Sequence, residues 1–272
     1  MSLSDLSTAF NKMKVSYYSG TPNLGGQRLK LLAKDDAKNV FCIPVDRIAS
    51  GDVAMPFRHP EFALAYYSSR NPTLSAKLEI ICDFARIRNH RIMRKCNDVI
   101  SKHENKKLFE FTSEMNDIDM SLPLLVDKAI KLGVNPYYYL NEDTDDDDVA
   151  QCTNSWCLNQ NSEPGKASDN IIIITDLDNV DWLILIERQN GPGRSQAAWA
   201  GGFVDKNETF TETALREKNE EVDIKLSSAN KVNYTTTITE LPVIVSKDWD
   251  PRAKFVEGME NGAIVTHYVF SL

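Results

Sequence analysis

The chain has 272 residues, of which 42% are hydrophobic and 26% charged, and its formal net charge is -8. This length allows one large or two ordinary domains. The negative charge argues against broad nucleic-acid binding, which needs a basic surface. No apolar run approaches the length of about eighteen residues that a membrane helix needs, and the N-terminus has neither the basic start nor the apolar stretch of a signal peptide.

The chain contains five cysteines, an odd number at scattered spacings. This pattern favours reduced thiols in a cytoplasmic protein over a disulfide framework. Cys152 and Cys157 are separated by four residues, but no second pair or nearby histidine completes a zinc site. We therefore expect a cytoplasmic protein without structural zinc.

The N-terminal region, residues 1–165, contains no catalytic motif. Residues 38–45 are predicted to form a short strand, and the apolar spacing in residues 78–102 predicts a long amphipathic helix. A second helix is expected over residues 122–132 and should end at Gly133. Basic residues between 86 and 107 are interpreted as the exposed face of a charged helix, with a local nucleic-acid site as the alternative. An α-rich α+β accessory region of unknown role is predicted.

The stretch from about residue 141 to 165 is predicted to be a linker. It begins with the acidic run Asn-Glu-Asp-Thr-Asp-Asp-Asp-Asp, which lacks the central glycine and terminal glutamate of an EF-hand calcium loop. Blocks of like charge tend to be disordered, and Ser-Glu-Pro-Gly at 162–165 is typical of a turn. We place the domain boundary near residue 165, with domains at 1–165 and 166–272.

Strands dominate the pattern after this boundary. Residues 171–175 and 182–186 are continuous apolar runs joined by a polar turn, which predicts a hairpin whose strands are buried on both faces. The remaining expected elements, in chain order, are a glycine-rich loop at 190–193, a strand at 202–204, an acidic helix from about 212 to 221, and strands at 233–239 and 263–271.

The acidic helix carries the pattern with the clearest chemistry. Glu217, Glu220 and Glu221 are spaced i, i+3 and i+4, so their carboxylates share one face of a helix. Like charges at this spacing destabilise a helix, and a hard divalent cation such as Mg²⁺ would offset the repulsion. The structural alternative is a solvated acidic helix face, which does not explain the spacing of these residues from Gly202, Glu208 and Arg216.

This spacing resembles the Nudix box, G-x5-E-x7-R-E-U-x-E-E-x-G-U, in which U is aliphatic. The matching positions are Gly202, Glu208, Arg216, Glu217, Glu220, Glu221 and Ile224. Lys218 stands at an aliphatic position, where its stem is expected to pass the helix edge, and Asp223 replaces a glycine. Asp223 is expected to tolerate a left-handed conformation just after the helix.

The resemblance implies an α/β fold over about residues 168–272: a Nudix-type α/β/α sandwich with a mixed sheet, preceded by the separate N-terminal region. It implies hydrolysis of a nucleoside diphosphate linked to another group. By resemblance, Glu217, Glu220 and Glu221 would hold Mg²⁺, or Mn²⁺ in its place, while Glu208 and Arg216 would form an ion pair that fixes the loop. The residues assigned to catalysis are Glu208, Arg216, Glu220 and Glu221.

The substrate indicated is ADP-ribose or a related ADP-sugar. Gly201-Gly202-Phe-Val and the later Asp-Pro-Arg at 250–252 resemble the ADP-ribose pyrophosphatase branch, although Ala197 and Ala200 occupy its tryptophan and proline positions. Gly201 and Gly202 would let the backbone approach the ligand. Arg252 would hold a phosphate or ribose, with a surface turn as the alternative. Trp199 would stack on adenine, with a core position as the alternative.

Other interpretations stay open. A Nudix-like sensor could bind a nucleotide or a partner without cleaving it, and an enzyme could act on dinucleoside polyphosphates, damaged nucleotides or capped RNA. The general base is undetermined, with Glu257 and Glu260 as candidates. The chain stops at Leu272, at the end of what should be a central strand. We expect that the N-terminal region supplies the elements that normally follow, that the domain is minimal, or that the chain is truncated. A homodimer is expected by resemblance.

Overall fold

The computed structural model describes residues 20–34, 37–47, 60–104, 122–136, 166–189, 197–227, 232–246 and 259–272. Its helices are α2 (Pro60–Tyr67), α3 (Pro72–Glu104), α5 (Leu122–Lys131) and α8 (Phe210–Glu221), with a short 3-10 turn η1 (Val45–Arg47). The strands are β1 (Leu29–Ala33), β2 (Ala37–Pro44), β3 (Lys166–Thr175), β4 (Asp181–Arg188), β5 (Ala197–Ala198), β6 (Ala200–Phe203), β7 (Val222–Leu226), β8 (Asn233–Ser246) and β9 (Met259–Ser271).

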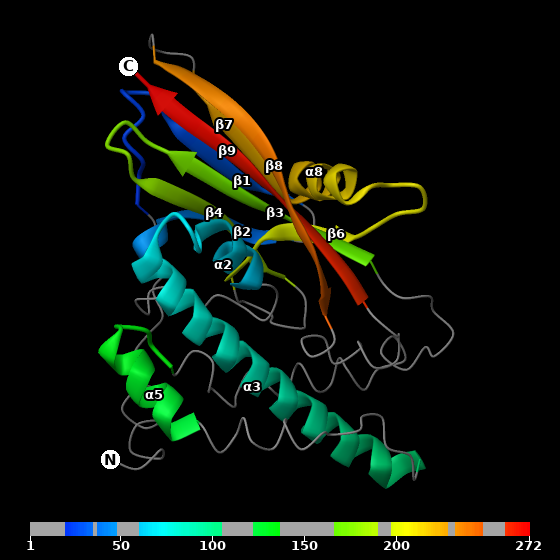
Figure 1. The fold of residues 1–272 in the computed structure, drawn as a ribbon. Coiled ribbons are helices and arrows are strands. Elements are labelled where there is room, and N and C mark those ends of the chain that lie inside the picture. Colours follow the sequence, from blue (N-terminus) through cyan, green and yellow to red (C-terminus); the bar gives the residue numbers. More distant parts are fainter. Residues whose placement is uncertain are drawn as a thin grey trace.

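The main sheet is mixed, as the sequence predicts. Its strand order is β2-β4-β3-β9-β8, with β5 added to β4 and β6 added to β3. Strands β3 and β9 run parallel, whereas the other pairs are antiparallel. The predicted hairpin is confirmed, since Thr175 of β3 pairs with Asp181 of β4. Figure 1 shows β9 between β3 and β8, with the small β6 at the end of the sheet nearest the loop that leads to α8.

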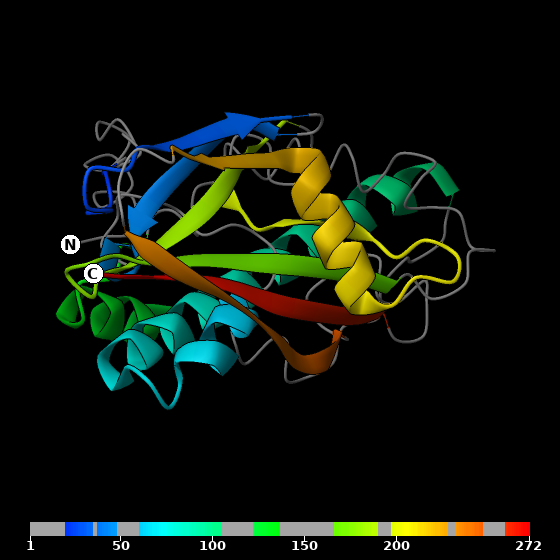
Figure 2. The ribbon, with the colours of Figure 1, turned by 90° about the horizontal axis from the view of Figure 1, so that it is seen from above.

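Both faces of the sheet are covered, which explains the continuous apolar run in β3. Ile171 and Ile173 pack in one cluster with residues of α2, α3 and α5. Ile172 and Ile174 belong to a second cluster on the opposite face, against which β1 and β7 pack. Helix α8 packs against β3, β6 and β9, and Figure 2 shows it on the side of the sheet opposite α2, α3 and α5. The three-layer α/β/α arrangement is therefore confirmed.

The N-terminal region contributes strands as well as helices. Strand β2 forms the edge of the main sheet by pairing with β4, and it closely matches the predicted strand at 38–45. Strand β1, which the periodicity does not reveal, pairs with β7 more than 180 residues later, from Leu29–Leu226 to Ala33–Val222. Elements on both sides of residue 165 thus form one set of layers. The position of the domain boundary itself stays a prediction.

The long helix α3 begins six residues earlier than the predicted helix, at Pro72, and its buried residues follow the predicted spacing from Leu78 to Ile87. Helix α5 ends as expected, because Gly133 adopts φ +71° just beyond it. Among the described residues, no helix is both long and apolar enough to span a membrane. The acidic tract, the turn at 162–165, Cys152 and Cys157 lie outside the described residues.

The expectation for Asp223 is wrong. Helix α8 runs directly into β7: its C-cap residue Val222 is extended, with φ -131° and ψ 124°, and Asp223 pairs with Leu32 of β1. Because the chain leaves the helix in an extended conformation, no left-handed residue is needed there. Lys218 is half-buried as its core-facing position requires, and burial together with nearby Lys34 lowers its pKa.

Candidate active site

A capping box sets the start of helix α8 and therefore the direction of its glutamates. The Thr209 side chain accepts a hydrogen bond from the Glu212 backbone, and the Glu212 side chain accepts one from the Thr209 backbone at 2.8 Å. This reciprocal pair satisfies backbone donors that a helix N-terminus leaves free. The helix begins at Phe210, two residues before the predicted start, and ends at Glu221.

The ion pair predicted between Glu208 and Arg216 is present. Arg216 donates from Nε to Glu208 Oε1 at 2.8 Å and from Nη2 to Oε2 at 3.0 Å, and it also donates to the carbonyl of Phe203 at 3.0 Å. Hydrogen bonds from Arg216, then from the Asp205 backbone and the Thr213 hydroxyl, lower the Glu208 pKa to about 2. The bidentate contact therefore ties the end of β6 and the following loop to helix α8.

Gly202 lies directly against Glu217. A Cβ atom added to this glycine would stand 2.3 Å from Glu217 Oε1 and 2.5 Å from its carboxyl carbon. Arg216 Nη1 donates to the same carboxylate at 2.7 Å. Burial raises the Glu217 pKa, and hydrogen bonding to Arg216 opposes this. A side chain at this position would therefore displace the Glu217 carboxylate.

Glu221 is the most buried carboxylate of the acidic helix, with 7% of its surface exposed. The backbone N–H of Gly201 donates to Glu221 Oε2 at 2.8 Å. Burial raises the Glu221 pKa to about 8; the hydrogen bond from Gly201 and the charge of Arg188 lower it, while the charges of Glu217 and Asp169 raise it further. Negative charge is therefore concentrated around Gly201 and Gly202.

Glu220 differs from the other two predicted ligands, because it is exposed and accepts a hydrogen bond from Arg216 Nη1 at 3.1 Å. Arg216 thus contacts all of Glu208, Glu217 and Glu220. Within the described part of the chain, no three His, Cys, Asp or Glu side chains form a ready-made metal cluster. The sequence spacing brings the glutamates to one helix, and the arginine holds two of them.

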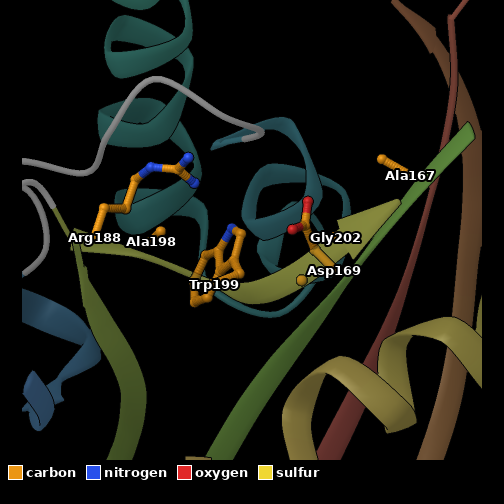
Figure 3. A pocket seen from close by; sticks show the side chains of 7 residues that line it. Ala167, Asp169, Arg188, Ala198, Trp199 and Gly202 are labelled. Atoms are coloured by element: carbon orange, nitrogen blue, oxygen red, sulfur yellow. The ribbon is translucent and has the colours of Figure 1, made fainter. Parts of the chain in front are cut away.

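A pocket adjoins these carboxylates (Figure 3). The residues that line it are Ala167, Asp169, Arg188, Ala198, Trp199, Gly201 and Gly202. Asp169 and Arg188 are pocket residues that the sequence analysis missed. A Cβ on Gly201 would stand 2.1 Å from Asp169 Oδ1, so this carboxylate lies over the glycine. The signal in the sequence was a polar residue close to each apolar run: Asp169 stands two residues before the run of β3, and Arg188 stands two residues after the run of β4.

Trp199 takes the predicted core position, and stacking on adenine stays a prediction. It is buried in the core cluster shared with α2 and α3, and it lines the pocket. Glu260, one of the two candidate bases, forms an ion pair with Lys166 at 3.1 Å, at the paired ends of β3 and β9. The other candidate base, Glu257, and Arg252 lie outside the described residues.

The donor set around Gly201 and Gly202 fits a hard divalent cation. The carboxylates of Glu217 and Asp169 raise the Glu221 pKa, which means that they repel its charged form. A cation among them would remove this repulsion, and carboxylate oxygens are the ligands that Mg²⁺ and Mn²⁺ prefer. Of the three predicted ligands, Glu217 and Glu221 belong to this donor set, together with Asp169, whereas Glu220 is exposed and pairs with Arg216.

The family model described as NUDIX domain matches residues 166–270. Among solved structures, the chain is similar to a MutT/nudix family protein from Enterococcus faecalis, at 26% identity and a TM-score of 0.28, over 42% of this chain and 40% of that one. The curated proteins include no match.

Two further structures are similar at 18% identity. One is the NUDIX domain of NrtR from Shewanella oneidensis, complexed with ADP ribose, with a TM-score of 0.27 over 41% of this chain and 62% of that one. The other is a bifunctional NMN adenylyltransferase/ADP ribose pyrophosphatase from Francisella tularensis, complexed with AMP and a Mn ion, with a TM-score of 0.29 over 60% of this chain and 48% of that one. The chain thus spans between two fifths and two thirds of the length of each of these proteins.

Proposed function

We propose that the chain is a divalent-metal-dependent hydrolase that cleaves the diphosphate of a nucleoside diphosphate derivative. The match of residues 166–270 to the NUDIX domain family model supports this class. The observation that carries the proposal is the cluster at Gly201 and Gly202. There Glu221 accepts the Gly201 N–H at 2.8 Å, and Glu217 fills the space beside Gly202. A diphosphate bound there would meet closely spaced carboxylates that need a cation, together with the positive charge of Arg188 in the pocket wall.

Each residue of the cluster has a distinct role in this proposal. Glu217, Glu220 and Glu221 hold Mg²⁺, with Mn²⁺ as a substitute, and the bound cation would neutralise diphosphate charge and acidify the attacking water. Glu208 and Arg216 position the helix relative to β6, since their bidentate contact spans the loop. Gly201 and Gly202 allow the ligand to approach the backbone.

We further propose ADP-ribose or a related ADP-sugar as the substrate, with AMP and a sugar phosphate as products. The support is in the sequence: Gly201-Gly202-Phe-Val at the start of the box and Asp-Pro-Arg at 250–252. In this proposal Arg252 binds a phosphate or the terminal ribose, and Trp199 stacks on the adenine. The position of Trp199 in the wall of the pocket beside Gly201 supports its assignment.

The direct test is AMP release from ADP-ribose by the purified protein in Mg²⁺, with Glu221→Gln as the variant. A glutamine keeps an oxygen that can accept the Gly201 N–H but removes the charge that would bind the metal. We expect turnover by the wild type and a loss of at least about 100-fold in the variant. Turnover of ADP-ribose at least tenfold slower than that of a dinucleoside polyphosphate or capped RNA would reject the substrate but keep the enzyme class.

A nucleotide-sensing domain is the second candidate function, and the contacts of Arg216 favour it. This guanidinium already pairs with Glu217 and Glu220 at 2.7 and 3.1 Å, so metal binding has to compete with it. A sensor would bind ADP-ribose in equilibrium dialysis, with or without Mg²⁺, and release no AMP. Product formation that Glu221→Gln abolishes would eliminate the sensor.

We also propose a cytoplasmic homodimer. Cys42 and Cys82 are free thiols, which suits a reducing compartment. The dimer is supported by β8, a long strand at the edge of the sheet with exposed Tyr234 and Ile238. Strand edges of this kind pair readily with a second chain. Mass measurement by light scattering tests the oligomeric state.

A further inference from the structure

A buried amide on β9 is paired with a strand residue that lines the pocket. Asn261 has 2% of its surface exposed, and among the residues that the structure describes neither its side-chain oxygen nor its side-chain nitrogen has a hydrogen-bond partner. Most buried polar groups in proteins are hydrogen-bonded, because an unpaired one is destabilising. The unpaired amide of Asn261 therefore lowers the stability of the ligand-free folded protein. A ligand or a water that hydrogen-bonds to it would remove this cost.

The register of the sheet places Asn261 next to the floor of the pocket. Asn261 pairs with Ala167 of β3 in the parallel ladder, and Ala167 lines the pocket. Directly paired residues lie on the same face of a sheet, and alternate residues along a strand share a face. Asn261 is thus on the face that includes Ala167, Asp169 and Ile171, which is the face covered by α2 and α3.

The two sides of Gly202 differ in whether they can bind a ligand. On one side, Arg216 is committed to Glu208, Glu217 and the Phe203 carbonyl. On the other side lies the pocket with the Trp199 indole in its wall. If the diphosphate lies at Gly201 and Gly202, as the proposed function requires, the nucleoside extends toward Trp199 and the neighbouring β3–β9 ladder.

We propose that Asn261 recognises the adenine edge of the bound nucleotide, an inference that rests on the proposed function for the place of the diphosphate. An amide presents a donor beside an acceptor, and adenine presents its N6 amino group beside N1 on one edge and N7 on another. Guanine presents two acceptors, O6 and N7, on the edge that includes N7, so an amide gains both partners from guanine only at the edge formed by O6 and N1–H. Asn261 would thereby gain both missing partners on binding.

The test measures AMP binding by titration calorimetry without metal, so that it needs no turnover. In Asn261→Leu we expect AMP affinity to fall at least about tenfold, since both base contacts are lost. The thermal midpoint of the ligand-free variant should be equal to or above that of the wild type, because an unpaired buried amide has been removed. A purely structural amide, or one that holds only a water, would instead lower the midpoint and leave AMP affinity unchanged.

Thr266→Val is the matched control. Thr266 is on the same strand, is 2% exposed, and its hydroxyl also lacks a partner. It lies five residues from Asn261 and therefore on the opposite face of the sheet. We expect Thr266→Val to leave AMP affinity unchanged, and a loss equal to that of Asn261→Leu would overturn the assignment.

Asn261→Asp tests the direction of the hydrogen bonds. A carboxylate only accepts, and guanine offers two adjacent donors, N1–H and the N2 amino group. We expect the ratio of AMP affinity to GMP affinity to fall at least about tenfold in the variant, and an unchanged ratio would overturn the proposal. The inference and the proposed hydrolysis can be rejected independently. If AMP binding depends on Asn261 but ADP-ribose is not hydrolysed, the inference holds and the proposed enzyme activity is rejected. If ADP-ribose is hydrolysed and Asn261→Leu has the same KM as the wild type, the enzyme activity holds and the inference is rejected.

Discussion

Arg216 and Glu208 form a two-point contact across the loop between β6 and α8. The Nε–Oε1 distance is 2.8 Å and the Nη2–Oε2 distance is 3.0 Å, and a third bond from Arg216 reaches the Phe203 carbonyl. A planar guanidinium can make these contacts at once, because its donors have a fixed fork geometry. The contact sets where Gly202 lies relative to Glu217, and hence the geometry of the proposed metal site.

Arg216→Lys should therefore lower activity while leaving the fold intact. A lysine ammonium is a point charge that cannot bridge Glu208, Glu217 and the Phe203 carbonyl together. We expect kcat with ADP-ribose to fall about tenfold to 100-fold, the range for small misplacements of a reactive centre. The measurement is steady-state kinetics, with circular dichroism to verify folding.

Asp205→Asn is the control for the arginine variant. Its carboxylate is exposed and lies 3.9 Å from Arg216 Nη2, so it adds little to the fixed geometry. We expect its kcat to match that of the wild type. If Arg216→Lys were as active as Asp205→Asn, the positioning role of the arginine would be wrong.

Alanine variants at Gly202 and Gly133 separate two effects of an added side chain: a clash with a neighbouring group at Gly202 and backbone strain at Gly133. Alanine at Gly202 would place Cβ 2.3 Å from Glu217 Oε1, which forces that carboxylate to move. Gly202→Ala should therefore weaken Mg²⁺ binding and reduce activity by about tenfold or more. Calorimetric titration with Mg²⁺ and steady-state kinetics measure these two effects.

Gly133→Ala is the complementary variant. Nothing lies within 4 Å of the added Cβ, but φ is +71°. This left-handed conformation costs an alanine about 1 kcal/mol. We expect a loss of stability in urea denaturation and no change in Mg²⁺ affinity or activity. A Gly202→Ala variant that behaved in the same way would show that Glu217 is not part of the site.

The sequence predicted the local features of the site better than its surroundings. The spacing of Gly202, Glu208 and Arg216 anticipated the ion pair because it reflects contacts within one loop and one helix. The continuous apolar runs of β3 and β4 likewise anticipated a sheet buried on both faces. Such features depend on neighbours in the chain, so the pattern of residue types is sufficient to find them.

Pairing between strands far apart in the chain could not be predicted from the pattern of residue types. The short strand β1 is only partly buried, and its partner β7 lies almost 200 residues away, so neither gives a periodic signal. The pocket depends on Asp169 and Arg188 meeting Gly201 across three strands, which requires the sheet order. The extended conformation at Asp223 was missed for the same reason, since pairing with β1 determines it.

The proposed dimer makes a clear prediction at the edge strand. Within the described residues β8 pairs only with β9, and Asn233–Thr239 contains no charged residue that would oppose pairing with another copy. Ile238 is 50% exposed there. We expect the wild type to be a dimer by light scattering and Ile238→Lys to be a monomer. Leu124→Lys, at the exposed surface of α5, should stay dimeric; a monomeric wild type would exclude the dimer.

A buried carboxylate on α2 offers a test of stability against pH. Burial raises the Glu61 pKa from 4.5 to about 7, although a backbone hydrogen bond and the charge of Arg86 lower it, and its Oε2 atom has no hydrogen-bond partner. The folded protein therefore holds this proton more tightly than the unfolded chain does. Its contribution to stability is complete below pH 4.5 and is lost as the pH rises through 7.

Glu61→Gln should remove this loss, because the amide cannot ionise. At pH 8 we expect the variant to be more stable than the wild type by about 1 to 3 kcal/mol, and near pH 4.5 the two should agree. Urea denaturation at a series of pH values gives both free energies of unfolding. Glu79→Gln, at an exposed position of α3, should follow the wild type throughout. Parallel pH curves for Glu61→Gln and the wild type would mean that Glu61 is ionised at little cost in the folded protein.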